Sequence, residues 1–204
     1  MKLLILGATG GIGLELVRQA VERGYSLTAF VRSPERLEAF QGGVEIIPGD
    51  LLDPSQLERV VRGHDAVLSA FGPRSSTERQ RRDFAVGLTQ AMRDARRKRV
   101  LIVSVAFLFR DSIVPPAYLA GRLFFPHAVA DAAEMEGVVR ESGLDWTIVR
   151  PPRLTNKPAA GRYRVREGHL PRFGFSIARA DVADFMIRTV ENRTFIGKVV
   201  GISN

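Results

Sequence analysis

Short apolar runs alternate with amphipathic segments along most of the chain. Runs rich in Val, Ile and Leu predict strands over 2–6, 26–31, 44–47, 65–70, 100–105, 145–149 and 198–202. Apolar residues at helical spacing predict helices over 12–23, 34–40, 54–62, 79–97, 127–142 and 181–191. Asp53 is placed to be the N-cap of the helix over 54–62, with Pro54 in its first turn. Because strands and helices alternate and the strands are almost continuously apolar, the pattern favours an α/β fold, a doubly wound parallel sheet with helices on both faces.

The segment 106–126 interrupts this alternation. It is largely apolar and contains Pro115, Pro116 and Pro126, which predicts an irregular loop or lid over a site. Elsewhere the sequence shows no linker, internal repeat or low-complexity stretch. We therefore expect one domain over residues 1–204.

A glycine-rich turn joins the first predicted strand to the first helix. Residues 7–13 read Gly-Ala-Thr-Gly-Gly-Ile-Gly. Gly7 permits a tight turn, Gly10 lets the backbone approach a pyrophosphate, and Gly13 lets the helix pack closely on the strand. The N–H groups at the helix N-terminus then attract the anion. The turn predicts a dinucleotide site, and a glycine-rich turn that binds nothing is the alternative.

The end of the second strand predicts which dinucleotide is bound. Many NAD-binding proteins place an acid here against the ribose, whereas this chain has Arg32, with Arg36 four residues later. A guanidinium is suited to a 2′-phosphate, so the pair predicts NADP(H). The alternative is that Arg32 is an exposed loop arginine.

The next two strand ends supply further candidates. After the third strand, Asp50 is placed to accept from the adenine amino group and Leu51 to pack on the ring, although Asp50 could instead form a local Asx turn. After the fourth strand, Gly72 lets the backbone pass close to the cofactor beside Phe71. Arg74 is placed to reach a phosphate or a substrate carboxylate.

Composition narrows the remaining function classes. The formal net charge is +8, and basic residues gather over 93–99 and at 79, 81 and 82. We interpret them as a solvated helix face, with attraction of anionic ligands or nucleic acid as the alternative. No nucleic-acid-binding motif is present, so a nucleic-acid partner is disfavoured. Cysteine is absent and the three histidines are scattered, which argues against disulfides, thiolate catalysis and a metal site. With no apolar run of membrane-spanning length and no signal peptide, we expect a cytoplasmic protein without a membrane partner.

Three segments resemble the atypical short-chain dehydrogenase/reductases. These are the glycine turn with the Val31-Arg32 and Gly49-Asp50 pairs that follow it, the stretch from Glu136 to Pro152, and the stretch from Ile177 to Ala183. The second and third are similar to segments of the NmrA-like and flavin-reductase branches. Residues 105–108 and 114–116 resemble biliverdin-IXβ reductase/flavin reductase in particular. The resemblance covers essentially the whole chain.

The resemblance implies a Rossmann-like fold with NADPH bound across the top of the sheet. By position, the cofactor contacts would be Gly7, Thr9, Gly10, Gly11, Ile12, Gly13, Arg32, Arg36, Asp50, Leu51, Phe71, Gly72 and Arg74. Ser104, Val105 and Ala106 would lie beside the nicotinamide, with Pro151, Pro152 and Arg153 on the other side. The chain departs from the biliverdin/flavin reductases at Val105, where they have a second hydroxyl residue, and at Arg153, where they have His.

The chemistry expected of this site is a reduction without a dedicated proton donor. None of Tyr25, Tyr118 and Tyr163 has a lysine four residues later, so the Tyr-x-x-x-Lys pair of ordinary short-chain dehydrogenases is missing. Tyr118 is followed by Arg122, and we weigh that pair as a dyad against an aromatic residue of the lid. Planar conjugated acceptors such as flavin need no such acid, because solvent can protonate them after hydride transfer.

We therefore expect an NADPH-dependent reductase of a small planar acceptor, with Ser104 in an orienting role. The substrate candidates are Phe107, Phe124, Arg110 and Arg153, where the aromatic rings would stack and the arginines would anchor acid groups. One alternative is an NmrA-like sensor that binds NADP(H) without turnover and docks on a protein partner. Another is a sugar- or isoprenoid-modifying member of the superfamily, which the missing Tyr-x-x-x-Lys pair disfavours.

Overall fold

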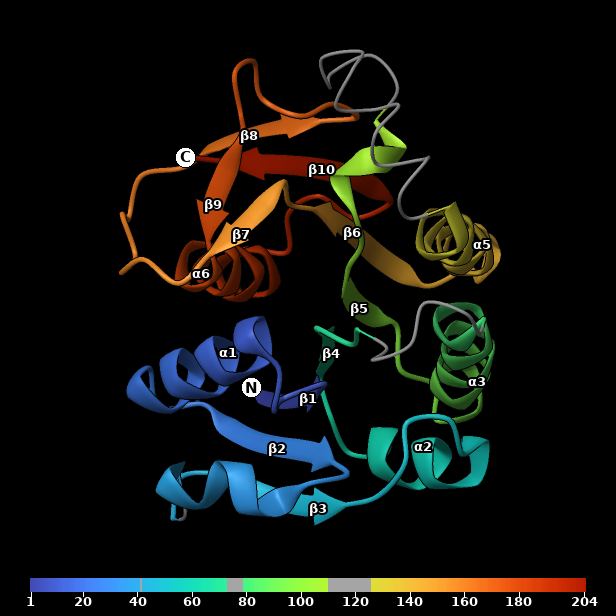
Figure 1. The fold of residues 1–204 in the computed structure, drawn as a ribbon. Coiled ribbons are helices and arrows are strands. Elements are labelled where there is room, and N and C mark those ends of the chain that lie inside the picture. Colours follow the sequence, from blue (N-terminus) through green and yellow to red (C-terminus); the bar gives the residue numbers. More distant parts are fainter. Residues whose placement is uncertain (41, 73–78, 110–125) are drawn as a thin grey trace.

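An eight-stranded sheet forms the centre of the molecule. The computed structural model describes residues 1–40, 42–72, 79–109 and 126–204 (Figure 1). The strand order is β3-β2-β1-β4-β5-β6-β10-β8, and every neighbouring pair is parallel except β10 and β8. The strands are β1 (Lys2–Leu6), β2 (Ser26–Val31), β3 (Glu45–Pro48), β4 (Ala66–Ser69), β5 (Arg99–Val103), β6 (Asp145–Arg150), β8 (Arg164–Glu167) and β10 (Lys198–Ser203). A separate parallel pair joins β7 (Arg153–Thr155) to β9 (Ser176–Ala178).

Helices cover both faces of the sheet (Figure 1). On one face lie α1 (Gly11–Glu22) and α6 (Arg179–Glu191), and on the other lie α2 (Pro54–Val61), α3 (Gln80–Asp94) and α5 (Pro126–Glu141). Two 3₁₀ helices, η1 (Pro34–Phe40) and η2 (Ala106–Leu108), complete the described helical elements. Among the described residues, none of these helices combines the length and the apolar character that crossing a bilayer would need.

The continuous apolar runs of the strands arise because both faces of the sheet are buried. In β1, Leu3 and Ile5 pack in the core beneath α1 and α6, whereas Leu4 and Leu6 pack in the core beneath α2 and α3. All four side chains are fully buried. A strand whose side chains are buried in a core on each face of the sheet needs an apolar residue at every position, which is typical of parallel sheets.

The predicted α/β class, the doubly wound sheet and the two helical layers are confirmed, and at one edge of the sheet the pair β10–β8 is antiparallel. The sequence did not predict β7, β8 or β9. Two of these strands have only three residues, and all four residues of β8 are exposed, so none produces an apolar run. Within the predicted lid, 106–108 forms η2 and Pro126 opens α5, while 110–125 lies outside the described residues.

The strand order reverses between β1 and β4. The chain leaves β1 for α1 on one face, and it leaves β4 toward α3 on the other face. In doubly wound sheets such a switch point opens a crevice at the carboxyl ends of the strands, where ligands bind. The fold therefore places a cleft at the end of β1.

Candidate functional site

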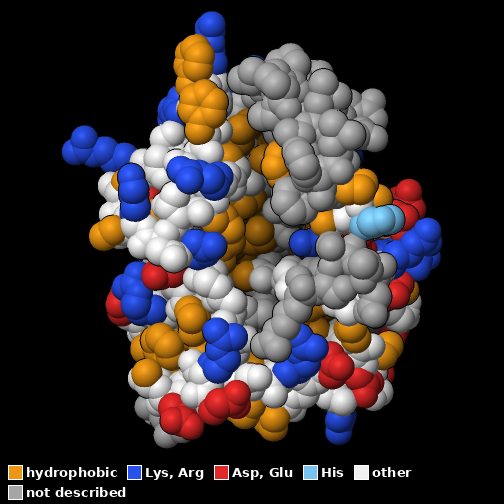
Figure 2. Space-filling model, viewed as in Figure 1, with side chains coloured by type: hydrophobic (Ala, Val, Ile, Leu, Met, Phe, Trp, Pro, Cys, Tyr) orange, Lys and Arg blue, Asp and Glu red, His pale blue; other side chains and the backbone are white. Residues whose placement is uncertain are grey.

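A cleft of about 440 Å³ opens at the carboxyl ends of β1, β2, β3, β4 and β5. On this side the molecule is hollowed near its middle, with Lys and Arg side chains around the hollow (Figure 2). We call it the nucleotide cleft. The predicted cofactor residues that line it are Gly7, Thr9, Gly10, Gly11, Ile12, Arg32, Arg36, Asp50, Leu51, Phe71, Gly72, Ser104 and Val105. The structure thus brings together residues from five separate strand ends.

The glycine turn forms the floor of the cleft at the end of β1. Gly7 has a φ of +77°, and a Cβ there would lie 2.8 Å from the Phe71 nitrogen. Its carbonyl accepts a hydrogen bond of 3.0 Å from the Gly10 N–H. Gly10 is the N-cap residue of α1 and has no side chain that could accept a hydrogen bond from the first N–H groups of the helix. These N–H groups therefore face the cleft without a side-chain partner. This arrangement fits a diphosphate.

Gly13 does not line the cleft, although the sequence placed it among the cofactor contacts. It lies beneath the turn, where a Cβ would overlap the carbonyl oxygen of Gly7. Its role is the packing of α1 on β1, which is the physical reason that the turn motif ends in glycine.

Cationic side chains dominate the cleft. Its described lining has four arginines and one carboxylate, that of Asp50. Arg32 and Arg36 lie together after β2 and are exposed. Asp50 Oδ1 accepts a 3.1 Å hydrogen bond from the Leu52 N–H, so the Asx turn is present while the residue still borders the cleft. The balance of charge favours an anionic ligand.

Two of these arginines were not predicted as site residues. Arg179 begins α6 and lies across α1, with its Cδ 2.5 Å from where a Cβ on Gly11 would stand. Arg81 begins α3, and its guanidinium lies 3.7 Å from the carboxylate of Asp131 on α5. Burial lowers the pKa of Arg81. Arg81 lies in the first turn of α3, and Arg179 follows β9, a three-residue strand that the sequence did not predict, so only the tertiary fold reveals that both residues reach the cleft.

The expectation that the basic stretch is a solvated face is wrong for Arg99 as well as for Arg81. Arg99 starts β5 and is buried, and its Nη1 donates to the Asp145 carbonyl at 2.9 Å and to Thr147 Oγ1 at 2.8 Å. Burial lowers its pKa to about 10. It holds the starts of β5 and β6 together at the end of the sheet opposite the cleft.

A buried charged cluster stands at the far end of the cleft. Ser104, just after β5, donates its hydroxyl proton to Glu136 Oε1 at 2.6 Å. Arg150, the last residue of β6, holds the same carboxylate through Nε at 2.8 Å and Nη2 at 2.6 Å. Arg140 Nη2 donates to Oε2 at 3.0 Å. A carboxylate has about four lone-pair positions, and here all four are used.

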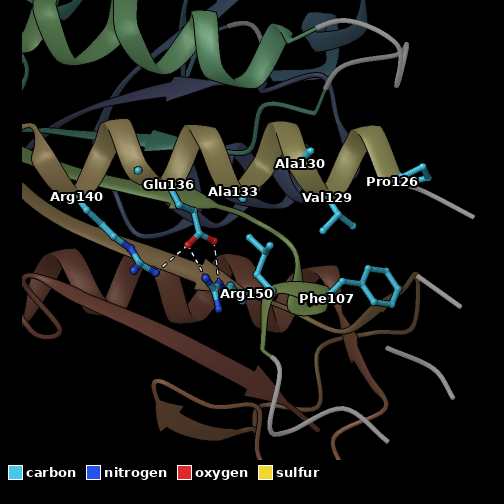
Figure 3. A pocket seen from close by; sticks show the side chains of 10 residues that line it. Phe107, Pro126, Val129, Ala130, Ala133, Glu136, Arg140 and Arg150 are labelled. Carbon is cyan, nitrogen blue, oxygen red and sulfur yellow. Dashed lines mark hydrogen bonds and ion pairs between the residues drawn. The ribbon is translucent and has the colours of Figure 1, made fainter. Parts of the chain in front are cut away.

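Glu136 also lines a second cavity, of about 460 Å³, between α5, η2 and the end of β6 (Figure 3). We call it the α5 pocket. Its other lining residues are Phe107, Leu108, Pro126, Val129, Ala130, Ala133, Gly137, Arg140 and Arg150. Since Ser104 lines the cleft and bonds to Glu136, the two cavities meet at this hydrogen bond. Of the predicted substrate residues, Phe107 borders the α5 pocket.

Other predicted residues do not border either cavity. Ala106 packs against Phe109 in a small separate core, and Pro151 is buried. Pro152 and Arg153 follow the chain as it turns away into β7, which pairs with β9. Arg74, Arg110, Tyr118 and Phe124 lie outside the described residues, so their predicted roles stay predictions.

A doubly wound sheet with a glycine-lined helix N-terminus at its switch point defines a dinucleotide-binding protein of the Rossmann type. The comparison with known families agrees. The chain belongs to the NAD(P)H-binding family, whose model matches residues 7–193.

Individual relatives are more distant. An uncharacterized chloroplastic protein of Arabidopsis thaliana is 31% identical over 215 residues, covering 98% of this chain and 76% of the relative. The (4-alkanoyl-5-oxo-2,5-dihydrofuran-3-yl)methyl phosphate reductase of Streptomyces griseus is 28% identical over 73% of this chain, which spans only 46% of that enzyme. Among solved structures, ChuY, an anaerobilin reductase of Escherichia coli O157:H7, superposes with a TM-score of 0.84 at 21% identity, covering 100% of this chain and 97% of that one. The structural likeness shows a shared fold.

Proposed function

We propose that this protein is an NADPH-dependent reductase that transfers a hydride to a planar conjugated acceptor such as a flavin, in the branch of the biliverdin-IXβ and flavin reductases. The observation that carries the proposal is the state of the Ser104 hydroxyl. Its proton is donated to Glu136, so the lone pairs of Ser104 Oγ are what remains for a ligand. The residue at the reacting end of the cleft is an acceptor and not an acid.

The Glu136 carboxylate cannot take over as the acid. It accepts from Ser104, from Arg140 and twice from Arg150. Four donors already surround its two oxygens, so the carboxyl group presents no free oxygen to the cleft. Ser104 is therefore suited to accept from the carboxamide N–H₂ of the nicotinamide and to fix the orientation of that ring.

The described lining of the nucleotide cleft contains no Tyr, Lys or His. Tyr163 packs against α6 and donates to Asp184 Oδ2 at 2.7 Å. Burial and this hydrogen bond raise the pKa of Tyr163, so it keeps its proton. Tyr25 donates likewise to Glu191. Neither of these two tyrosines borders the cleft, which removes both as proton donors to a substrate there.

This arrangement suits an acceptor that water can protonate. Bound NADPH supplies two electrons and one proton as a hydride from the nicotinamide ring. A flavin takes that hydride at N5, spreads the negative charge over its ring system, and receives its second proton from solvent. The protein then contributes binding, orientation and exclusion of competing geometries. The names of the S. griseus and E. coli proteins, both reductases, support this class.

The cleft also supports a choice of NADP(H) over NAD(H). We assign the diphosphate to the N-terminus of α1, the adenine to the side of Asp50 and Leu51, and the 2′-phosphate to Arg32 and Arg36. No carboxylate follows β2 to bind a free ribose hydroxyl, since the chain there reads Arg32-Ser33.

The test is an acceptor screen with purified protein. NADPH oxidation is followed at the nicotinamide absorbance band with FMN, riboflavin, a quinone and biliverdin, and each reaction is repeated with NADH. We expect turnover of at least one planar acceptor with NADPH, and slower turnover with NADH. Tight NADPH binding in calorimetry without turnover of any acceptor would refute the reductase and favour the NADP(H) sensor.

Ser104→Ala tests the orienting role separately. The variant is expected to weaken binding of NADP⁺ about fivefold and to leave 2′-phospho-ADP-ribose, which lacks the nicotinamide, unchanged. Equal weakening of both ligands would contradict the placement of Ser104 beside the nicotinamide.

A further inference from the structure

The α5 pocket is a second cavity that the nucleotide does not need. It borders the cleft at the Ser104–Glu136 hydrogen bond, since Ser104 lines the cleft and Glu136 lines the pocket. In Figure 3, Glu136 and Arg150 meet beside Arg140 at one end of the pocket, and Phe107 and Pro126 lie toward the other end. At about 460 Å³, the cavity falls in the range of small-molecule sites, about 300–1,000 Å³.

The pocket is kept open at a cost to its own helix. Gly137 lies in the interior of α5, and a Cβ built on it would meet none of the described residues within 4 Å. Close packing against the described part of the chain therefore does not require glycine at this position. Glycine in a helix interior is less stable than alanine. With Ala130 and Ala133 on the same face, it leaves a flat wall with space in front of it.

The pocket is also positively charged. Two guanidiniums, those of Arg140 and Arg150, share the single carboxylate of Glu136. The Arg150 guanidinium is already engaged by other groups: it donates two hydrogen bonds to Glu136 and lies 4.5 Å over the centroid of the Phe109 ring. Arg140 makes one hydrogen bond, through Nη2, among the described residues, and its side chain is 46% exposed. The uncompensated positive charge of the pocket therefore lies on Arg140, whose guanidinium has further N–H groups that can donate to a ligand.

We propose that the α5 pocket receives the hydride acceptor, and that this acceptor is a flat molecule carrying an acidic group, phosphate or carboxylate, which Arg140 binds. The proposal rests on the reductase function proposed above and deepens it. The Ala130–Ala133–Gly137 wall and Phe107 accommodate the ring, and Arg140 fixes its anionic arm. The ring then reaches toward Ser104, where the two cavities meet.

FMN and riboflavin test this assignment, because they share one ring system and differ in a phosphate. We expect the wild-type KM for FMN to be about tenfold below that for riboflavin. In Arg140→Gln the ratio of the two KM values should approach one, because the KM for FMN rises toward that for riboflavin. The matched control is Arg62→Gln, which removes an arginine from another i,i+4 Arg–Glu pair, on α2 and away from both cavities. It should leave the ratio as in the wild type.

A filling variant tests the location. Gly137→Leu should project into the pocket and abolish FMN binding, measured by quenching of flavin fluorescence on protein saturated with NADP⁺. NADPH binding in calorimetry should persist and thereby show that the variant is folded. In the same assay, Arg140→Gln should weaken FMN binding and leave riboflavin binding close to its wild-type value.

The outcomes separate this proposal from the reductase function. Flavin turnover that neither Arg140→Gln nor Gly137→Leu alters would overturn the α5 pocket as the acceptor site and leave the reductase standing. FMN binding that depends on Arg140, without any turnover, would overturn the reductase and keep the pocket as an anion-bearing ligand site. Equal wild-type binding of FMN and riboflavin would overturn the acidic arm.

Discussion

Glu136→Gln should be one of the most destabilising conservative substitutions in this chain. The carboxylate is 2% exposed and accepts four hydrogen bonds. Glutamine keeps the shape but removes the charge, and its N–H₂ group must point at a guanidinium or at Ser104. Arg150, which is 7% exposed, would then carry a buried charge without a counterion.

The magnitude follows from the burial of the pair. Breaking a buried ion pair by neutralising one partner costs about 3–5 kcal/mol. The stacking of Arg150 over Phe109 remains in the variant and favours the lower end of that range. With a urea m-value of about 3 kcal/mol per molar, the unfolding midpoint should fall by about 1–1.7 M in a urea titration followed by circular dichroism.

Two further variants make the reasoning refutable. Glu136→Met combined with Arg150→Met replaces the pair by apolar groups and should recover most of the loss, because such replacements are often neutral or stabilising. Glu58→Gln, in the exposed Arg62–Glu58 pair, should cost less than about 0.5 kcal/mol. A loss below about 1 kcal/mol for Glu136→Gln would show that the pair is solvated in solution. Failure of the double variant to recover stability would show that packing, and not charge, sets the cost.

Three more predictions concern the cofactor, the glycines and pH. Arg32→Glu should weaken NADPH binding about tenfold in calorimetry and NADH binding far less, and equal weakening would remove the 2′-phosphate assignment. Gly13→Ala should lower the melting temperature and the NADPH affinity, because the new Cβ would overlap the Gly7 carbonyl. Gly137→Ala should instead raise the free energy of unfolding by about 0.5–1 kcal/mol. If both substitutions stabilised the protein, the packing described for Gly13 would be contradicted. Burial lowers the pKa of His64, so the unfolded chain takes up its proton first. Stability should therefore fall as the pH drops below about 6.5, and His64→Gln should flatten that slope in urea titrations at pH 5 and pH 7, while an unchanged slope would assign it to other groups.

The sequence predicted the parts of the site that are local. The turn over 7–13, the N-cap of α2 at Asp53 and the arginine after β2 each depend on neighbours within a few residues. Asp53 Oδ1 accepts from the N–H groups of Ser55 and Gln56, as the Asp-Pro pattern indicates. Such signals survive because the backbone geometry that they require is set by the residues themselves.

The parts that could not be predicted depend on contacts between distant segments. Glu136 was noted only as the start of a recurrent segment, and its partners Ser104 and Arg150 come from two other elements. Asp131 likewise caps α3 from α5, accepting from the N–H groups of Arg81 and Arg82 at 3.1 and 3.0 Å. The helical pattern of the sequence indicates only that Glu136 and Asp131 occupy buried positions. No spacing rule predicts which arginine or N–H group each carboxylate binds.

The edge strand β8 bears on how this protein behaves at high concentration. In the described sheet it is the last strand, and its residues Arg164, Val165, Arg166 and Glu167 are all exposed. A strand from another molecule that paired with β8 would have to remove water from the guanidiniums of Arg164 and Arg166 and pack its own side chains against them. An eight-stranded sheet that ends this way resists edge-to-edge stacking, so preparations concentrated for crystallisation or calorimetry should stay free of fibrous aggregates, and replacing both arginines by valine should remove that protection.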